Sequence, residues 1–172
     1  MTDTVKPEAA TGPVPTVPMS HAIHIGESDL PHIDLGDGST FQLLQVDLNI
    51  GLWVLRTRFQ PGYQVTKHYH TGSVFAVTLA GSWFYKEYPE YVNTEGSYLF
   101  EPAHSVHTLM VGEDNTEPTD VWFAIYGSNV NIDENGDVIS ITDAQQILAR
   151  YRAACDELGL DHSAVIVNGE QG

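Results

Sequence analysis

The sequence has a single cysteine, Cys155, among its 172 residues. One cysteine excludes an intramolecular disulfide and a cluster of thiolate metal ligands. Cys155 lies in the helical pattern "YRAACDELGL", and a free cysteine usually behaves as a small apolar side chain. We therefore expect Cys155 to be buried in the core.

Basic residues are also scarce, since 7 Lys and Arg residues stand against 23 Asp and Glu residues, and the formal net charge is −16. Such a charge repels phosphate backbones and anionic lipid surfaces. No run of about 18 apolar residues, the length that spans a bilayer, is present. The stretch "MTDTVKPEAATGPVPTVPMS" lacks the basic and apolar segments of a secretion signal. We expect a cytoplasmic protein with no nucleic-acid partner and no membrane partner.

The residues that are plentiful favour a mainly β protein. The 3 Trp, 8 Tyr and 6 Phe residues accompany 15 Gly residues, a composition typical of strands and turns. The length suits one domain, which we place over residues 21–160. Before it, residues 1–20 contain several prolines without apolar periodicity and predict an extended or disordered arm. After it, residues 161–172 form a polar tail.

Short apolar runs separated by turn residues predict a series of strands. In residues 52–59, Trp53, Leu55, Thr57 and Phe59 alternate with Val54, Arg56 and Arg58, which is the period of two expected of a strand. Asn135-Gly136 predicts a hairpin turn. The even spacing of the predicted strands indicates a β-sandwich or a β-barrel. The predicted strands are residues 41–48, 52–59, 74–79, 82–88, 97–101, 106–111 and 121–127.

A helix is predicted at the end of the domain, over residues 143–158. Thr142 begins the capping-box pattern "TDAQ" with Gln145, and Gly159 is a natural stop. An apolar stripe recurs at helical spacing, so we expect this face to dock on the barrel. The stripe consists of Ile147, Tyr151, Ala154 and Leu158.

Two histidines, His68 and His70, lie two residues apart in "GYQVTKHYHTGSVF". If this stretch is extended, both imidazoles project from one face of a strand and Tyr69 projects from the other. A metal ion would be able to bind both. Two surface histidines on an edge strand are the simpler alternative when these residues are taken alone.

The surrounding spacing resembles the two metal-binding motifs of the cupin superfamily. Gly62 is followed by five residues and then His68 and His70, and Gly96 is followed by five residues, Pro102 and later His107. The resemblance implies a double-stranded β-helix, or jelly-roll barrel, in which His68, His70 and His107 are the metal ligands. The motif glutamate is missing, because Val74 and Phe75 occupy its place, and His104 stands where the motif has glycine.

The sequence therefore resembles the three-histidine cupins, among them acetylacetone-cleaving dioxygenase and 2,4'-dihydroxyacetophenone dioxygenase. The second group is matched by "HTGSVFAVTLAGSWFYKE" and "EGSYLFEPAHSVHTLMV". The resemblance implies an Fe(2+)-dependent oxidoreductase that cleaves the C–C bond of an aryl 2-hydroxyketone with O2. With 2,4'-dihydroxyacetophenone the products would be 4-hydroxybenzoate and formate. It also implies a homodimer or homotetramer.

Further residues are candidates for the site. Glu101 would fix a ligand imidazole or remove a substrate proton, and His104 would serve the same purposes or only hydrogen-bond in its loop. We expect Arg56 and Arg58 to form salt bridges rather than to bind a phenolate. Aromatic residues of the strands would line an apolar substrate pocket or simply fill the core. They are Trp53, Phe75, Phe84, Tyr85, Tyr98 and Trp122.

Other functions remain open from the sequence. A β-diketone is an alternative substrate, and a cupin hydrolase or isomerase is an alternative enzyme. A non-enzymatic zinc-binding sensor module is an alternative of another class, because related cupin domains of anti-sigma factors hold zinc. Three histidines suit Zn2+ and other divalent transition metals as well as iron, so the ligands alone do not select the metal.

Overall fold

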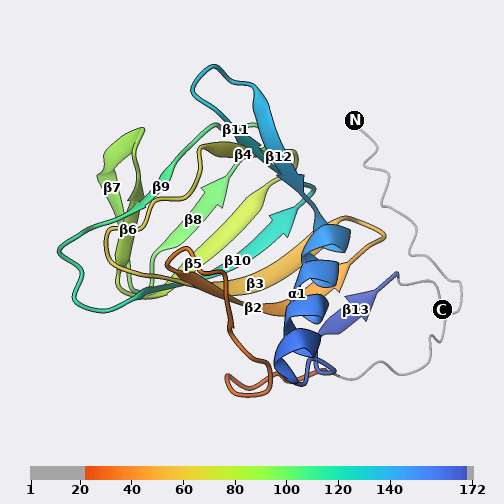
Figure 1. Ribbon diagram of the computed structural model, residues 1–172. Coiled ribbons are helices and arrows are strands. Elements are labelled where there is room, and N and C mark those ends of the chain that lie inside the picture. Colours follow the sequence, from red (N-terminus) through yellow and green to blue (C-terminus); the bar gives the residue numbers. More distant parts are fainter. Residues whose placement is uncertain (1–21, 170–172) are drawn as a thin grey trace, which may run out of the picture.

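The computed structural model describes residues 22–169, and a curved sheet is its largest element (Figure 1). The predicted arm over residues 1–20 lies outside the described residues. The sheet follows the order β1-β2-β3-β10-β5-β8, and β13 pairs with β2 in parallel. Its strands are β1 Ile33–Asp34, β2 Ser39–Asp47, β3 Leu52–Phe59, β5 Val74–Ala80, β8 Tyr98–Glu101, β10 Thr119–Tyr126 and β13 Ile166–Asn168.

Two smaller sheets complete the architecture, with the orders β12-β11-β4 and β7-β6-β9. Two isolated β-bridges connect the two small sheets. One joins His68 of β4 to His107, which precedes β9, and the other joins Gln64, which precedes β4, to Met110 of β9. The result is a mainly β fold of the jelly-roll type, as the sequence predicts. The strands are β4 His68–His70, β6 Ser82–Tyr85, β7 Tyr88–Thr94, β9 Leu109–Val111, β11 Asn129–Ile132 and β12 Val138–Thr142. The β11–β12 hairpin turns at Asn135-Gly136, as predicted.

The single helix in the described part of the chain, α1 Ala144–Leu158, packs against β1 and β2. Its Tyr151 is fully buried against Phe41 and donates a hydrogen bond to the Pro31 carbonyl at 2.6 Å. Cys155 is buried, as predicted, and Gly159 ends the helix in the left-handed conformation with φ 66°. Neither this helix nor any other described segment is a helix long and apolar enough to cross a membrane.

Two details of the predicted helix are wrong. The N-cap is Asp143 rather than Thr142, since the Asp143 carboxylate accepts a hydrogen bond from the Gln146 N–H at 2.8 Å. Asp and Thr are both good N-caps, so two adjacent candidates leave the start uncertain by one residue. Leu158 was expected to dock on the barrel but is 62% exposed, whereas Cys155, three residues earlier, is buried.

Two predicted segments also differ in the structure. Residues 82–88 do not form one strand, because the chain turns at Lys86 and Glu87 and pairs Tyr85 with Tyr88. This turn contains no Gly, Pro, Asn or Asp to mark it in the sequence. The expected polar tail, residues 161–172, contains the short strand β13, whose three residues are too short a run to be recognised from periodicity.

An ion-pair cluster lies on the outward face of β3 and β10. Nε and Nη2 of Arg56 each donate to the Asp120 carboxylate at 2.7 Å, and Nε of Arg58 donates to it at 2.9 Å. Burial raises the pKa of Asp120, but the hydrogen bonds from Arg56 and Arg58 outweigh burial and hold the pKa below its usual value. Both arginines are thus engaged in salt bridges, as predicted.

We expect Asp120→Asn to lower the free energy of unfolding by about 2–4 kcal/mol, because it leaves two arginines without their buried partner. The native carboxylate has a lowered pKa, so its contribution is complete above the unfolded pKa of about 4 and is lost as the pH falls through the folded pKa. Urea unfolding at pH 7 and at pH 3 measures the difference. The exposed Asp114→Asn is the control, and equal stability of the two variants at pH 7 would contradict the expectation.

Candidate metal centre

His68 and His70 lie at the two ends of the short strand β4 and face the same side. Both are 6% exposed, whereas Tyr69 between them projects to the other side. Pairing of His70 with Asn129 and of His68 with Asn131 on β11 fixes the strand. The alternation of a β-strand therefore directs both imidazoles into the barrel, which agrees with the orientation expected from their spacing.

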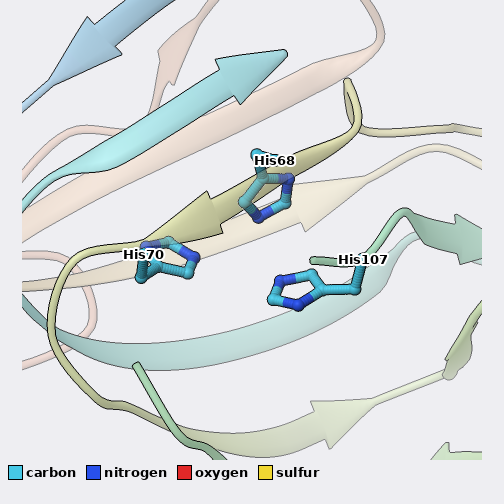
Figure 2. A group of neighbouring side chains, drawn as sticks. All are labelled: His68, His70 and His107. Atoms are coloured by element: carbon cyan, nitrogen blue, oxygen red, sulfur yellow. The ribbon is translucent and has the colours of Figure 1, made fainter. Parts of the chain in front are cut away.

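His107 lies opposite these histidines, immediately before β9. Its backbone exchanges two hydrogen bonds of 3.0 Å with the backbone of His68, and its side chain is 2% exposed. Figure 2 shows the three rings converging from β4 and from the opposite segment. One ring nitrogen from each histidine lies within 4.8 Å of the other two, a spacing at which a single ion can contact all three.

The protonation of the three rings suits metal binding. Burial lowers the pKa of His70 to about 2 and that of His107 to about 3, and the neighbouring imidazoles add to both shifts. Burial also lowers the pKa of His68. The Nδ1 of His68 lies 2.7 Å from the Thr66 carbonyl, which leaves its Nε2 lone pair free. All three imidazoles are neutral at pH 7, as metal ligands must be.

Glu101, at the end of β8, is brought to the histidines. It is 4% exposed, and its Oε2 lies 3.3 Å from the Nε2 of His107 and 3.6 Å from that of His70. This oxygen and the His107 Nε2 are both buried and without a hydrogen-bond partner in the described residues. Unpaired buried polar atoms are rare, and a cation bound beside these two atoms would satisfy both of them.

Tyr85 on β6 donates a hydrogen bond to the other oxygen of Glu101, Oε1. Burial, together with the charge of Glu101, raises the pKa of Tyr85 well above its usual value, so the phenol stays protonated and acts as a donor. Burial raises the pKa of Glu101 to about 7, although the Tyr85 hydrogen bond opposes this rise. The carboxylate is therefore held in position at one oxygen and free at the other.

His104 does not join the site. The residue is exposed, its backbone N–H donates to the His70 carbonyl at 2.8 Å, and its ring centroid lies 5.9 Å from that of Tyr69, on the outer side of β4. Its φ of 67° is the left-handed conformation that favours glycine. The loop carries the His104 side chain away from the centre, so its position does not support the catalytic role suggested for it.

A cavity of about 210 Å³ extends from the histidines into the barrel. Of the six aromatic residues suggested for a substrate pocket, Trp53 and Tyr85 line this cavity. The other four aromatic residues do not line the cavity, because their side chains project from the outer face of their strands. The inner face is taken by their buried neighbours in the sequence, such as Val74, Trp83 and Phe123. The residues wrongly placed in the pocket are Phe75, Phe84, Tyr98 and Trp122.

Most of the cavity wall is apolar, and several of its residues were not expected from the sequence. The lining includes Leu55 of β3, Phe123 and Ile125 of β10, and Ile147 of the helix. Phe123 and Ile125 are on the face opposite Trp122, which only the register of β10 reveals. Helical periodicity indicates that Ile147 is buried, but it does not show that the helix reaches the cavity.

Three buried histidines converge in a jelly-roll barrel beside an apolar cavity, an arrangement that could hold a divalent metal ion. The family follows from the sequence comparison, in which the ChrR cupin-like domain family matches residues 20–122. The chain belongs to this family. No curated protein matches the sequence.

Solved structures share this fold. A cupin-like protein of unknown function from Ralstonia eutropha JMP134 is 32% identical with a TM-score of 0.81, and the match covers 91% of this chain and 98% of that chain. An RmlC-like cupin from the same organism is 23% identical with a TM-score of 0.74, covering 81% of this chain and 92% of that chain. Acetylacetone dioxygenase from Acinetobacter johnsonii is 17% identical with a TM-score of 0.68, and the match covers 80% of this chain and 95% of that chain. The last two similarities establish the fold alone.

Proposed function

We propose that the chain is a non-haem iron(II)-dependent dioxygenase that cleaves the C–C bond of an aryl 2-hydroxyketone with O2. His68, His70 and His107 would hold the metal. The observation that carries the proposal is a centre of three neutral imidazoles at which the usual motif carboxylate is replaced by buried Val74 and outward-facing Phe75. Such a ligand set cancels none of the charge of a divalent cation and so favours an anionic, chelating substrate.

Bound iron would supply a Lewis acid for the substrate oxygens and electrons for O2. The residues of the chain supply the rest. We assign to Glu101 Oε2 the removal of the proton beside the ketone, because this oxygen lies with the histidine nitrogens and not behind the rings. Tyr85 holds the other carboxylate oxygen. The apolar walls exclude water from the reacting carbon atoms.

The cavity supports a substrate with one ring. Its volume of about 210 Å³ lies below the roughly 300–1,000 Å³ of sites for drug-sized ligands. Trp53, Phe123 and Leu109 offer an apolar surface for an aromatic ring. 2,4'-Dihydroxyacetophenone fits this description and would yield 4-hydroxybenzoate and formate. A β-diketone is the alternative substrate, suggested by the similarity in fold to an acetylacetone dioxygenase.

An oxygen electrode tests the proposal. We expect protein loaded with iron(II) under anaerobic conditions to consume O2 when 2,4'-dihydroxyacetophenone is added, and to consume it more slowly with acetylacetone. Chromatography should detect 4-hydroxybenzoate and formate in amounts equal to the O2 consumed. Absence of O2 uptake with every hydroxyketone and diketone tried would sink the proposal.

A zinc-binding sensor module is the second candidate, and the match to the ChrR cupin-like domain family favours it. Metal analysis of protein purified in air separates the two functions. Tightly held zinc, together with no activity after exchange for iron, supports the sensor, whereas iron-dependent turnover supports the enzyme. Under either function we retain the prediction of a homodimer or homotetramer, for which the exposed Tyr98 and Phe100 on the outer face of β8 offer an apolar contact surface.

A further inference from the structure

The cavity runs along the inner face of β3, so its two ends are set by positions on one strand. Trp53 lies in the same row across the sheet as Ile125, Val74 and Glu101, which is the row next to the histidines. Thr57 projects from the same face four residues later. Four residues of a strand span about 13 Å, so Thr57 marks the end of the cavity remote from the proposed metal.

This remote end contains hydroxyl groups, unlike the walls between. Thr57 is 7% exposed and Ser39 is 3% exposed, and both line the cavity. The Ser39 hydroxyl donates to Asp37 Oδ1 at 2.7 Å, which leaves its oxygen lone pairs as acceptors. Within residues 22–169, no side chain or backbone group is recorded as a hydrogen-bond partner of the Thr57 hydroxyl. The Thr57 hydroxyl does not belong to the fully buried unpaired atoms, so it keeps access to the cavity that the residue lines and is able to bind a ligand atom there.

The two hydroxyl groups are close enough to share one ligand oxygen. Phe41 pairs with Thr57 and Ser39 pairs with Phe59, so Ser39 and Thr57 are diagonal neighbours across β2 and β3. Diagonal side chains on one face are separated by up to roughly 7–8 Å, a gap that a bridging hydroxyl can span. Phe41 and Phe59 flank the pair, and Tyr63, whose hydroxyl donates to Asp37 Oδ2 at 3.0 Å, lines the same end of the cavity.

We propose that Thr57 and Ser39 form a subsite for a hydroxyl group at the far end of the substrate. A ligand hydroxyl there accepts a hydrogen bond from Thr57 and donates one to Ser39. The inference rests on the proposed function and narrows its substrate class to aryl ketones with a hydroxyl opposite the ketone. Thr57 is a specificity-determining residue, since it lies about 13 Å along the strand from the row that faces the metal ligands.

Calorimetric titration of the zinc-loaded protein tests the subsite without turnover. The probes are 4'-hydroxyacetophenone and acetophenone, which differ only in the distal hydroxyl. We expect the wild type to bind the hydroxylated probe about tenfold more tightly, as one or two hydrogen bonds allow. Thr57→Val keeps the side-chain shape and should abolish this preference. Thr57→Ser keeps a hydroxyl and should retain it, which separates recognition from packing.

Thr40→Val is the matched control, because Thr40 neighbours Ser39 on β2 but faces away from the cavity. It should leave the tenfold preference unchanged. An equal affinity of the wild type for both probes, or an unchanged preference in Thr57→Val, would overturn the inference. A preference that depends on Thr57, in a protein that consumes no O2 with any ketone, would uphold the subsite while rejecting the dioxygenase.

Discussion

Replacing His107 with alanine should lower the affinity for iron(II) or zinc by more than about 100-fold and abolish O2 uptake. Loss of an outer partner of a metal ligand typically costs 10–100-fold in affinity, and loss of one of only three ligands should cost more. His107 would be the ligand from the opposite segment of the barrel, so without it His68 and His70 would hold the ion from one side alone. Metal content after loading and gel filtration measures the effect.

His104→Gly is the matched control for His107→Ala. It removes an imidazole from the same loop, and glycine suits the φ of 67° at this position. The variant should bind metal and turn over as the wild type does. Circular dichroism must show that both variants are folded. If His107→Ala retained the full metal content, or if His104→Gly lost it, the assignment of the three-histidine centre would be wrong.

The position of the histidines could be predicted because two independent signals agree. The spacing of His68 and His70 gives their common face on a strand, and the glycine and proline offsets relate that strand to the distant His107. The structure then places all three rings together. The absence of the motif glutamate was also visible in the sequence, since Val74 and Phe75 occupy its place.

The sequence indicates where the strands lie, but it does not indicate which face of each strand points into the barrel. Phe75, Phe84, Tyr98 and Trp122 belong to predicted strands, yet all of them face away from the cavity. Alternation gives two faces, but it does not say which face is inside when both carry large apolar residues. The size of a side chain does not decide its face, because the small Val74 and Ala76 are buried on the inner face of β5 while the larger Phe75 between them faces outward.

Contacts between side chains that are distant in the sequence are the second feature that the sequence does not predict. The sequence suggested Glu101 as a candidate from its position six residues before His107, but not the hydrogen bond from Tyr85, which depends on the turn at Lys86 and Glu87. It also left two roles open for the carboxylate. The Oε2 atom of Glu101 lies 3.3 Å from His107 Nε2 and 3.6 Å from His70 Nε2, and proton transfer by this oxygen is the role that we propose.

Glu101→Gln should reduce kcat by about 10²–10³-fold while leaving bound iron near the wild-type amount. The magnitude is that of losing a general base, and an amide cannot accept the substrate proton. The amide oxygen can still accept the hydrogen bond from Tyr85, so the local packing should persist. Stopped-flow measurement of 2,4'-dihydroxyacetophenone consumption gives the rate, and metal analysis gives the iron content.

The control is Glu95→Gln, which changes an exposed acid on the loop before β8 and should behave as the wild type. Tyr85→Phe should lower kcat by about tenfold, because Glu101 loses the hydrogen bond that holds its carboxylate in position.

Measuring both kcat and the iron content of Glu101→Gln distinguishes the roles that the position of Glu101 permits. A variant that keeps its iron and loses turnover identifies the proton acceptor. A variant that loses iron in proportion to its activity identifies a fourth metal ligand, contributed by β8 in place of the missing motif glutamate. Full activity with full iron content would show that the buried carboxylate has neither role.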